Sequence, residues 1–313
     1  MLTSNHIITT IGQCIIQTVL YFDVFKYPLT ADEIYQNMSV ETPKDVFLQE
    51  LDQLIHMGLL KKKEGYILNS SSLETIVERR VKGNTAAERI LPLAHCYAKK
   101  VASFPFVEGV CISGGLSKNY FDEKGDFDFF VIVKPGRLWI SRTLLIVKYK
   151  FLPKHKKKYW CVNYFISSGN LSIPDRNLFV ATEIAYLLPA VNYNHYKDFL
   201  NCNAWYRDHF PNRPLSPGFN CIQQPKTVLK SFAETLLGGR LGEWLDNCLL
   251  RITLKHWRQK YQEMNNEDFE LQFRSRKDVC KRHTKGFQNS VLEEWEEKQA
   301  EYKKAFKMDF THQ

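Results

Sequence analysis

The chain of 313 residues has no run of roughly 18 consecutive apolar residues, so we expect no transmembrane helix. Its opening residues, MLTSNHIITT, lack the basic segment and the continuous apolar stretch of a secretory signal peptide. The eight cysteines include no CxxC pair and follow no regular spacing, which argues against a zinc site and a disulfide framework. We therefore expect reduced cysteines, a cytoplasmic location and no membrane partner.

The overall composition is that of a globular protein, with 44% hydrophobic and 25% charged residues. The net charge of +9 favours anionic partners such as nucleotides or nucleic acid. The length predicts two or three domains with substantial cores. We expect an α+β protein with a winged helix-turn-helix at 1–72, a helical connector at 73–106, a mixed-sheet domain at 107–215 and a helical region at 216–313.

Three helical patterns and one hairpin pattern fill residues 1–72. Thr30 precedes the second helix, and Glu33 three residues later completes a capping box. Three helices followed by a hairpin are typical of a winged helix-turn-helix. The predicted elements are helices at about 4–22, 31–38 and 43–57 and a hairpin that turns at Glu64-Gly65.

The third helix of this unit bears on DNA binding. In a winged helix it would enter a DNA groove, while Lys61–Lys63 in the hairpin would contact phosphate. DNA-reading helices are usually basic, yet this one carries Asp45, Glu50 and Asp52 against the single Lys44. We therefore favour a structural or partner-binding role and keep a DNA-binding regulator as an alternative.

Hydrophobic periodicity and breaking residues predict the remaining elements. The connector should form two helices separated at Gly83-Asn84, the second of which packs on the following sheet. Strands are expected at 107–113, from Asp126 to 133 and at 159–167, and helices at 137–152, 178–188 and 192–209. In the last third we expect helix at 227–261 with a break at Gly238-Gly239, an extended segment at 267–273 and a helix at 291–306.

The stretch from Cys111 to Val133, CISGGLSKNYFDEKGDFDFFVIV, carries the clearest functional signal. Asp126 and Asp128 alternate with Phe127, so on a strand both carboxylates would leave the same face. Two carboxylates held together are unfavourable without a cation or a proton between them, and Mg²⁺ commonly takes such a pair together with substrate phosphates. Gly114-Gly115 lies at an interval that would bring backbone N–H groups near those phosphates.

The order of these residues resembles the signature of the DNA polymerase β-like nucleotidyltransferase superfamily. An apolar strand, Gly114-Gly115, a spacer and Asp126-Phe127-Asp128 before another apolar strand all match, over roughly 107–167. The layout also resembles a group of bacterial nucleotidyltransferase-domain proteins that carry an N-terminal winged helix. This resemblance implies that residues 107–215 form a nucleotidyltransferase-like domain.

The resemblance implies transfer of a nucleoside monophosphate from an NTP to a hydroxyl acceptor, which would be a small molecule, a sugar or a protein. Asp126 and Asp128 would bind Mg²⁺ (or Mn²⁺) that bridges the triphosphate. The turn at Gly114-Gly115 would hold the terminal phosphates. The resemblance also assigns nucleotide contacts to Ser113, Ser117 and Lys118.

One position departs from the superfamily pattern. Members usually carry a third carboxylate on the next strand, where this chain has Asn163. Asparagine can coordinate through its carbonyl oxygen but cannot accept a proton. Three alternatives follow: the acceptor needs no base, another acid such as Asp175 or Glu183 folds in, or the domain binds nucleotides without turnover.

A basic cluster lies near the C-terminus, between residues 274 and 285. Its side chains would either reach the triphosphate across the cleft or form a solvated loop. The candidate anion-binding residues are Arg274, Arg276, Lys281 and Arg282.

Overall fold

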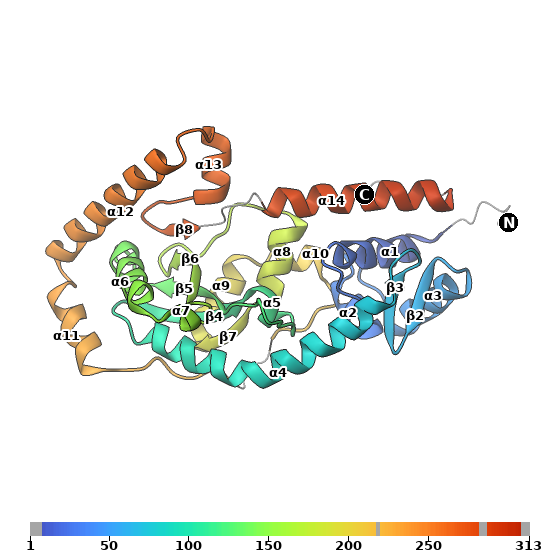
Figure 1. Ribbon diagram of the computed structural model, residues 1–313, viewed down its shortest axis with the longest axis horizontal. Coiled ribbons are helices and arrows are strands. Elements are labelled where there is room, and N and C mark those ends of the chain that lie inside the picture. Colours follow the sequence, from blue (N-terminus) through green and yellow to red (C-terminus); the bar gives the residue numbers. More distant parts are fainter. Residues whose placement is uncertain (1–7, 217–219, 282–286, 308–313) are drawn as a thin grey trace.

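The computed structural model describes residues 8–216, 220–281 and 287–307. It is an α+β protein with a three-stranded sheet, a five-stranded mixed sheet and a helical C-terminal part (Figure 1). The described helices include none with the length and apolarity needed to cross a membrane.

The N-terminal unit has three helices and an antiparallel sheet in the order β1-β3-β2. The capping box of Thr30 and Glu33 is confirmed, since each side chain accepts a hydrogen bond from the other residue's backbone N–H. The hairpin turns at Glu64 and Gly65, as predicted, and both have positive φ. The elements are α1 (Thr10–Asp23), β1 (Leu29–Thr30), α2 (Ala31–Asn37), α3 (Lys44–His56), β2 (Leu60–Lys63) and β3 (Tyr66–Asn69).

Two helix starts in this unit differ from prediction. Helix α1 begins at Thr10 because the Thr9 side chain caps it by accepting from the N–H of Gly12. The predicted start at Ser4 lies outside the described residues. Pro43 takes the N-cap position of α3, one residue before its predicted place in the first turn.

The predicted break at Gly83-Asn84 is wrong, because helix α4 (Thr75–Ala102) is continuous through it. Gly83 is buried in this helix, and a Cβ on it would collide with the ring of Tyr120. The N–H of Phe121 also donates to the Gly83 carbonyl at 3.1 Å. The glycine therefore permits close approach of a neighbouring loop, instead of ending the helix.

The five-stranded sheet has the order β7-β4-β5-β6-β8, with β5 and β6 parallel and the other pairs antiparallel. Sequence periodicity missed two of its strands. Pro189 lies within an edge strand and does not end a helix as predicted, since an edge strand tolerates a residue without an N–H donor. The strands are β4 (Val107–Ser113), β5 (Asp128–Val133), β6 (Cys161–Ser167), β7 (Leu188–Val191) and β8 (Val279–Lys281).

Alternate residues of the sheet enter two different cores. Phe129 and Val131 pack with α4, as expected for the second half of that helix, and with α6. Phe130 and Ile132 pack with α8 and α9 on the other face. The helices of this part are α5 (Gly114–Ser117), α6 (Leu138–Phe151), α7 (Lys154–Lys157), α8 (Leu178–Ala185), α9 (Tyr193–Cys202) and α10 (Tyr206–His209).

The C-terminal part begins with α11 (Val228–Leu236) and α12 (Arg240–Lys260), separated as predicted at Gly238-Gly239. The buried Arg137 donates to the carbonyls of Leu237, Gly238 and Gly239 at 2.8, 2.5 and 2.9 Å, which satisfies the end of α11. The segment predicted to be extended at 267–273 is instead helix α13 (Asn266–Phe273), because Asn265 caps it by accepting from the N–H of Asp268.

The last helix, α14 (Phe287–Phe306), returns to the N-terminal unit and lies along α1 (Figure 1). Trp295 donates its indole N–H to the carbonyl of Gln17 at 3.1 Å, and Lys298 pairs with Asp23 at 3.0 Å. This contact joins the two ends of the described chain and forms one side of the cavity described below.

Candidate functional site

The glycine turn and the second acid meet at the end of a strand pair. Antiparallel pairing of β4 with β5 sets Ser113 opposite Asp128, so Gly114 lies directly against the Asp128 carboxylate. Gly114 has φ of +69°, and a Cβ there would overlap that carboxylate. Both observations require glycine at this position.

The predicted pair of acids is brought together, but not on one strand. Strand β5 begins at Asp128, so Asp126 lies in the preceding loop, where it is exposed. Phe127 is buried between them. Ligand atoms of Asp126, Asp128 and Cys161 nevertheless lie within 4.8 Å of one another, which makes this the one such group of three or more acidic, thiol or imidazole side chains among the described residues.

The neighbouring strand β6 supplies two polar contacts to this cluster. Asn163, the residue at the expected third position, donates its Nδ2 to Oδ1 of Asp128 at 2.7 Å. Cys161 lies opposite Asp128 in the parallel register, and its thiol donates to Oδ1 of Asn163 at 3.2 Å. Cys161 was not predicted, although two residues of one parallel strand, i and i+2, share a face.

The electrostatics of the cluster favour a bound proton or cation. Burial, followed by the negative charge of Asp126, raises the pKa of Asp128 to about 7. Burial and then the two carboxylates also raise the pKa of the Cys161 thiol, which keeps that group neutral. A positive charge between the two aspartates would relieve the repulsion.

Asp128 lies at the wall of a cavity of about 440 Å³. The cavity is formed by α1, the glycine turn, the β5 and β6 strands, α8 and the start of α14. Its lining is largely aromatic and apolar, with polar groups around Asp128, which is the usual composition of a small-molecule site. The aromatic lining residues are Tyr21, Phe22, Phe25, Tyr27, Tyr120, Phe130, Tyr164, Phe179, Phe199 and Phe287.

The two acids proposed as substitutes for a third carboxylate also line the cavity, but both are paired with cations. Glu183 accepts from Lys118 at 2.8 Å. Asp175 accepts two bonds from Arg274, at 2.7 and 2.8 Å. Burial raises the pKa of Asp175, and the hydrogen bonds and positive charges of Arg274 and Lys281 together more than offset this, so the net pKa is lowered. Neither acid belongs to the cluster around Asp126 and Asp128.

The predicted nucleotide-binding residues occupy one side of the cavity. Ser113, Gly114, Gly115 and Lys118 line it, and the Lys118 amine also donates to the Gly114 carbonyl at 3.3 Å. Ser117 is buried beneath the turn and donates to that same carbonyl at 2.9 Å. Ser117 therefore supports the turn from below and does not face the cavity.

The predicted basic cluster divides into different environments. Lys281 is buried in β8, lines the cavity and lies 3.7 Å from Asp175. Arg274 is occupied by Asp175, while Arg276 is exposed and 3.5 Å from Glu270. Arg282 lies outside the described residues. The solvated-loop alternative is therefore wrong for Lys281, whose strand the sequence did not indicate.

The donor set fits a hard divalent cation. The carboxylates of Asp126 and Asp128 offer the oxygen ligands that Mg²⁺ and Mn²⁺ prefer, while the amide of Asn163 is hydrogen-bonded to Asp128 and Cys161. The Cys161 sulfur is a softer donor and adds nothing for Mg²⁺. Burial and the neighbouring charge of Asp126 raise the pKa of Asp128, and a cation beside the two carboxylates would lower it.

Comparison of the chain with protein-family models, with curated proteins and with solved structures finds no match.

Proposed function

We propose that this protein is a Mg²⁺- or Mn²⁺-dependent nucleotidyltransferase that moves a nucleoside monophosphate from an NTP to a hydroxyl acceptor. The observation that carries the proposal is that Gly114 meets Asp128 at the wall of the cavity, with the Asp126 carboxylate beside Asp128. A carboxylate cluster beside a backbone turn and an aromatic chamber suits a metal-bound triphosphate with an attached base.

Each group has a role that follows from its position. When bound, the cation neutralises charge on the triphosphate and on the in-line transition state. Asp126 and Asp128 hold it from one side, and Asn163 orients Asp128 through the 2.7 Å hydrogen bond. Lys118 and Lys281 line the same cavity and supply positive charge for phosphate oxygens.

The aromatic end of the cavity offers surfaces for a base or an acceptor. Phe130 and Tyr164 line the cavity and are stacked with ring centroids 5.0 Å apart; Phe130 is two residues after Asp128 on β5. Aromatic faces bind planar ligands without demanding one hydrogen-bond pattern. This supports nucleotide binding in general and leaves the acceptor as a small molecule, a sugar or a protein side chain.

A second candidate function is metal-dependent nucleotide binding without turnover. The observation that favours it is that Asn163 stands at the third position, where it cannot take a proton from an attacking hydroxyl. Glu183 and Asp175, the other acids at the cavity, are engaged with Lys118 and Arg274. Under this alternative the protein is a nucleotide-responsive regulator.

We also propose that the N-terminal unit is a winged helix used for packing or partner binding. The order α1-β1-α2-α3-β2-β3 supports that fold. DNA reading by α3 is disfavoured because Asp45 and Asp52 are exposed on it, while Lys44 is held by Asp32 at 2.8 Å. The same unit contributes α1 to the cavity wall, which gives it a structural role at the site.

The test separates binding from transfer. Binding of fluorescent NTPs is measured with Mg²⁺, with Mn²⁺ and with a chelator, and transfer is followed with α-labelled NTPs and a panel of hydroxyl compounds. The enzyme reading expects metal-dependent binding and transfer that Asp126→Asn with Asp128→Asn abolishes. Asp52→Asn, on the exposed face of α3, is the matched control.

Binding without transfer would support the regulatory alternative. The absence of metal-dependent NTP binding by the wild-type protein would refute both readings. Salt-sensitive binding to duplex DNA would support the alternative that the protein is a winged-helix DNA-binding regulator.

A further inference from the structure

Helix α11 and the start of α12 present an apolar surface to solvent. On an α-helix, the four large apolar residues of α11 project within about 100° of one another and so form one face. Leu241 and Trp244, at the start of α12 a few residues further along the chain, are exposed as well. We call the set the apolar ridge; its members and their exposed fractions are Val228 89%, Leu229 77%, Phe232 66%, Leu236 59%, Leu241 59% and Trp244 63%.

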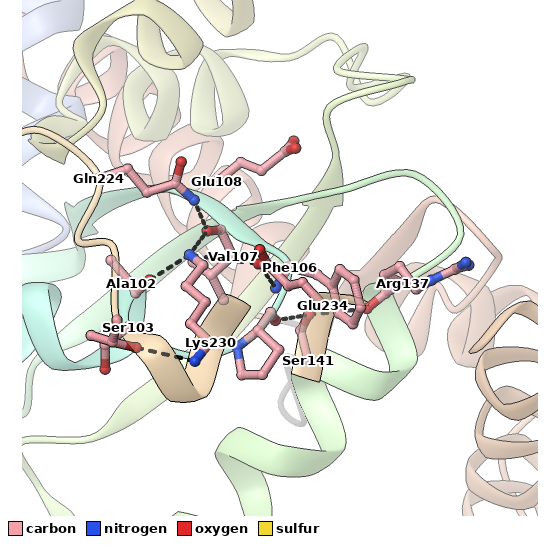
Figure 2. Close-up of polar contacts among 12 residues, drawn as sticks. Ala102, Ser103, Phe106, Val107, Glu108, Arg137, Ser141, Gln224, Lys230 and Glu234 are labelled. Atoms are coloured by element: carbon pink, nitrogen blue, oxygen red, sulfur yellow. Dashed lines mark hydrogen bonds and ion pairs between the residues drawn. The ribbon is translucent and has the colours of Figure 1, made fainter. Parts of the chain in front are cut away.

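The polar face of α11 is turned inward and is held there by specific contacts (Figure 2). Lys230, only 4% exposed, donates to the carbonyls of Ala102 and Val107 at 2.9 and 2.7 Å. Glu234 accepts from the N–H of Phe106 at 2.6 Å. Surface helices ordinarily bury their apolar stripe, so the orientation of α11 is the reverse of the usual one. These directional bonds fix the exposure of the ridge in the folded state.

Exposed basic side chains outnumber exposed acids along 226–260, where Glu243 is the exposed acid. Arg251 and Lys255 lie on the same side of α12 as the exposed Ile252, because positions separated by three or four residues are neighbours on a helix. Lys226 precedes α11 and Arg240 opens α12, and both are exposed. The surface is therefore positive as well as apolar, and it suits an anionic partner.

We propose that the apolar ridge docks this protein on an anionic lipid bilayer. Phe232, Trp244 and the aliphatic side chains would enter the headgroup region, while Lys226 and Arg240 contact lipid phosphates. A second copy of the chain is the weaker occupant, because two ridges would bring charges of one sign together. Nucleic acid would match the charge and leave the apolar side chains in water. Helices α11 and α12 lie at one outer edge of the molecule, where a flat surface can reach them (Figure 1).

The test measures co-flotation of the full-length protein with vesicles. Wild-type protein should bind vesicles of phosphatidylcholine mixed with phosphatidylglycerol at least about tenfold better than vesicles of phosphatidylcholine alone. Leu229→Ser with Phe232→Ser should weaken binding to the mixed vesicles by about tenfold or more. Leu73→Ser, at a position 74% exposed before α4, is the matched control and should bind as wild type does.

A second variant tests the charge separately from the apolar side chains. Arg251→Glu with Lys255→Glu should reduce binding to the mixed vesicles and leave the circular dichroism spectrum unchanged. The proposal is overturned if wild-type protein ignores anionic vesicles, or if the Leu229 and Phe232 variant binds them as well as wild type. It is equally overturned if sedimentation shows a dimer of wild-type protein that this variant converts to monomer, since the ridge would then be a subunit interface.

Discussion

Replacement of Asp128 by asparagine should stabilise the protein at neutral and alkaline pH. In the folded state the pKa of Asp128 is raised from the usual 3.8 to about 7, first by burial and then by Asp126. Between these values the folded protein holds a proton that the unfolded chain releases, so wild-type stability falls as pH rises. At about 1.4 kcal/mol for each tenfold change, the full penalty above pH 7 is at most about 4 kcal/mol.

Asp128→Asn removes this penalty with little change in shape. The new side chain keeps an oxygen that can accept the hydrogen bond from Asn163. We expect the variant to gain free energy of unfolding relative to wild type, and this gain should be about 3 kcal/mol larger at pH 8 than at pH 5. Urea unfolding at both pH values, in chelator and with Asp52→Asn as control, measures this difference.

Two results would refute the reasoning about Asp128. One is a variant that is less stable than wild type by the same amount at both pH values, which would make the carboxylate a structural group. The other is a difference in free energy of unfolding between variant and wild type that stays the same after Mg²⁺ is added. A cation held by Asp126 and Asp128 should lower the pKa of Asp128 and stabilise only the wild type, so the difference should shrink.

Three further substitutions test the packing and the polar network around the cavity. Gly83→Ala should lower the free energy of unfolding by about 1 to 3 kcal/mol, since its Cβ meets the Tyr120 ring, although the same change inside an open helix is usually stabilising. Arg274→Met should destabilise by about 2 kcal/mol by leaving Asp175 without its bidentate partner, and adding Asp175→Asn should restore part of that loss. Asn163→Asp should tighten Mg²⁺ binding by about tenfold, measured by titration calorimetry.

Two of these substitutions have a further control. Gly239→Ala places a methyl group in open space and should leave stability within about 0.5 kcal/mol of wild type. In chelator, Asn163→Asp should instead destabilise the protein, because a third carboxylate beside Asp128 adds repulsion when no cation is bound. A Gly83→Ala protein more stable than wild type would show that the contact with Tyr120 is loose.

Local signals in the sequence were reliable where one short segment determines its own structure. The capping box of Thr30 and Glu33 is complete within four residues, and the turn at Glu64-Gly65 places glycine at one of its two positions of positive φ. The glycine pair at Gly238-Gly239 likewise separates two helices as predicted. None of these depends on a distant part of the chain.

Tertiary contacts overrode the local signals elsewhere. Gly83 carries the same breaking signal as Gly238, yet it continues a helix because the ring of Tyr120 occupies the space beside it. Pro189 is a helix-ending residue by propensity, but an edge position in the sheet accepts it. Strand β8 has three residues inside a basic segment, and its extended form depends on pairing with β6 and with the preceding residues 274–276.

The candidate site shows the same division between local and distant information. The spacing of Gly114, Asp126 and Asp128 predicted their proximity, because the paired strands β4 and β5 return the chain on itself. The contribution of Cys161 depends on the parallel register of β5 with β6, which α6 and α7 separate in sequence. Asp175 and Glu183 line the cavity but are paired with Arg274 and Lys118. No local sequence pattern predicts these pairs.

The cavity itself is a product of chain ends that meet. Phe25 follows α1, Phe287 opens α14, and their ring centroids lie 6.3 Å apart, while Phe287 and Phe179 of α8 are 5.8 Å apart. All three rings line the cavity. A ligand that fills the chamber would therefore stabilise the contact between α1 and α14 as well as the sheet, since binding to the folded state alone raises stability throughout the linked structure. By the same linkage, loosening of α14 from α1 would lower the affinity for that ligand. This coupling would link the N-terminal unit to the site through packing alone.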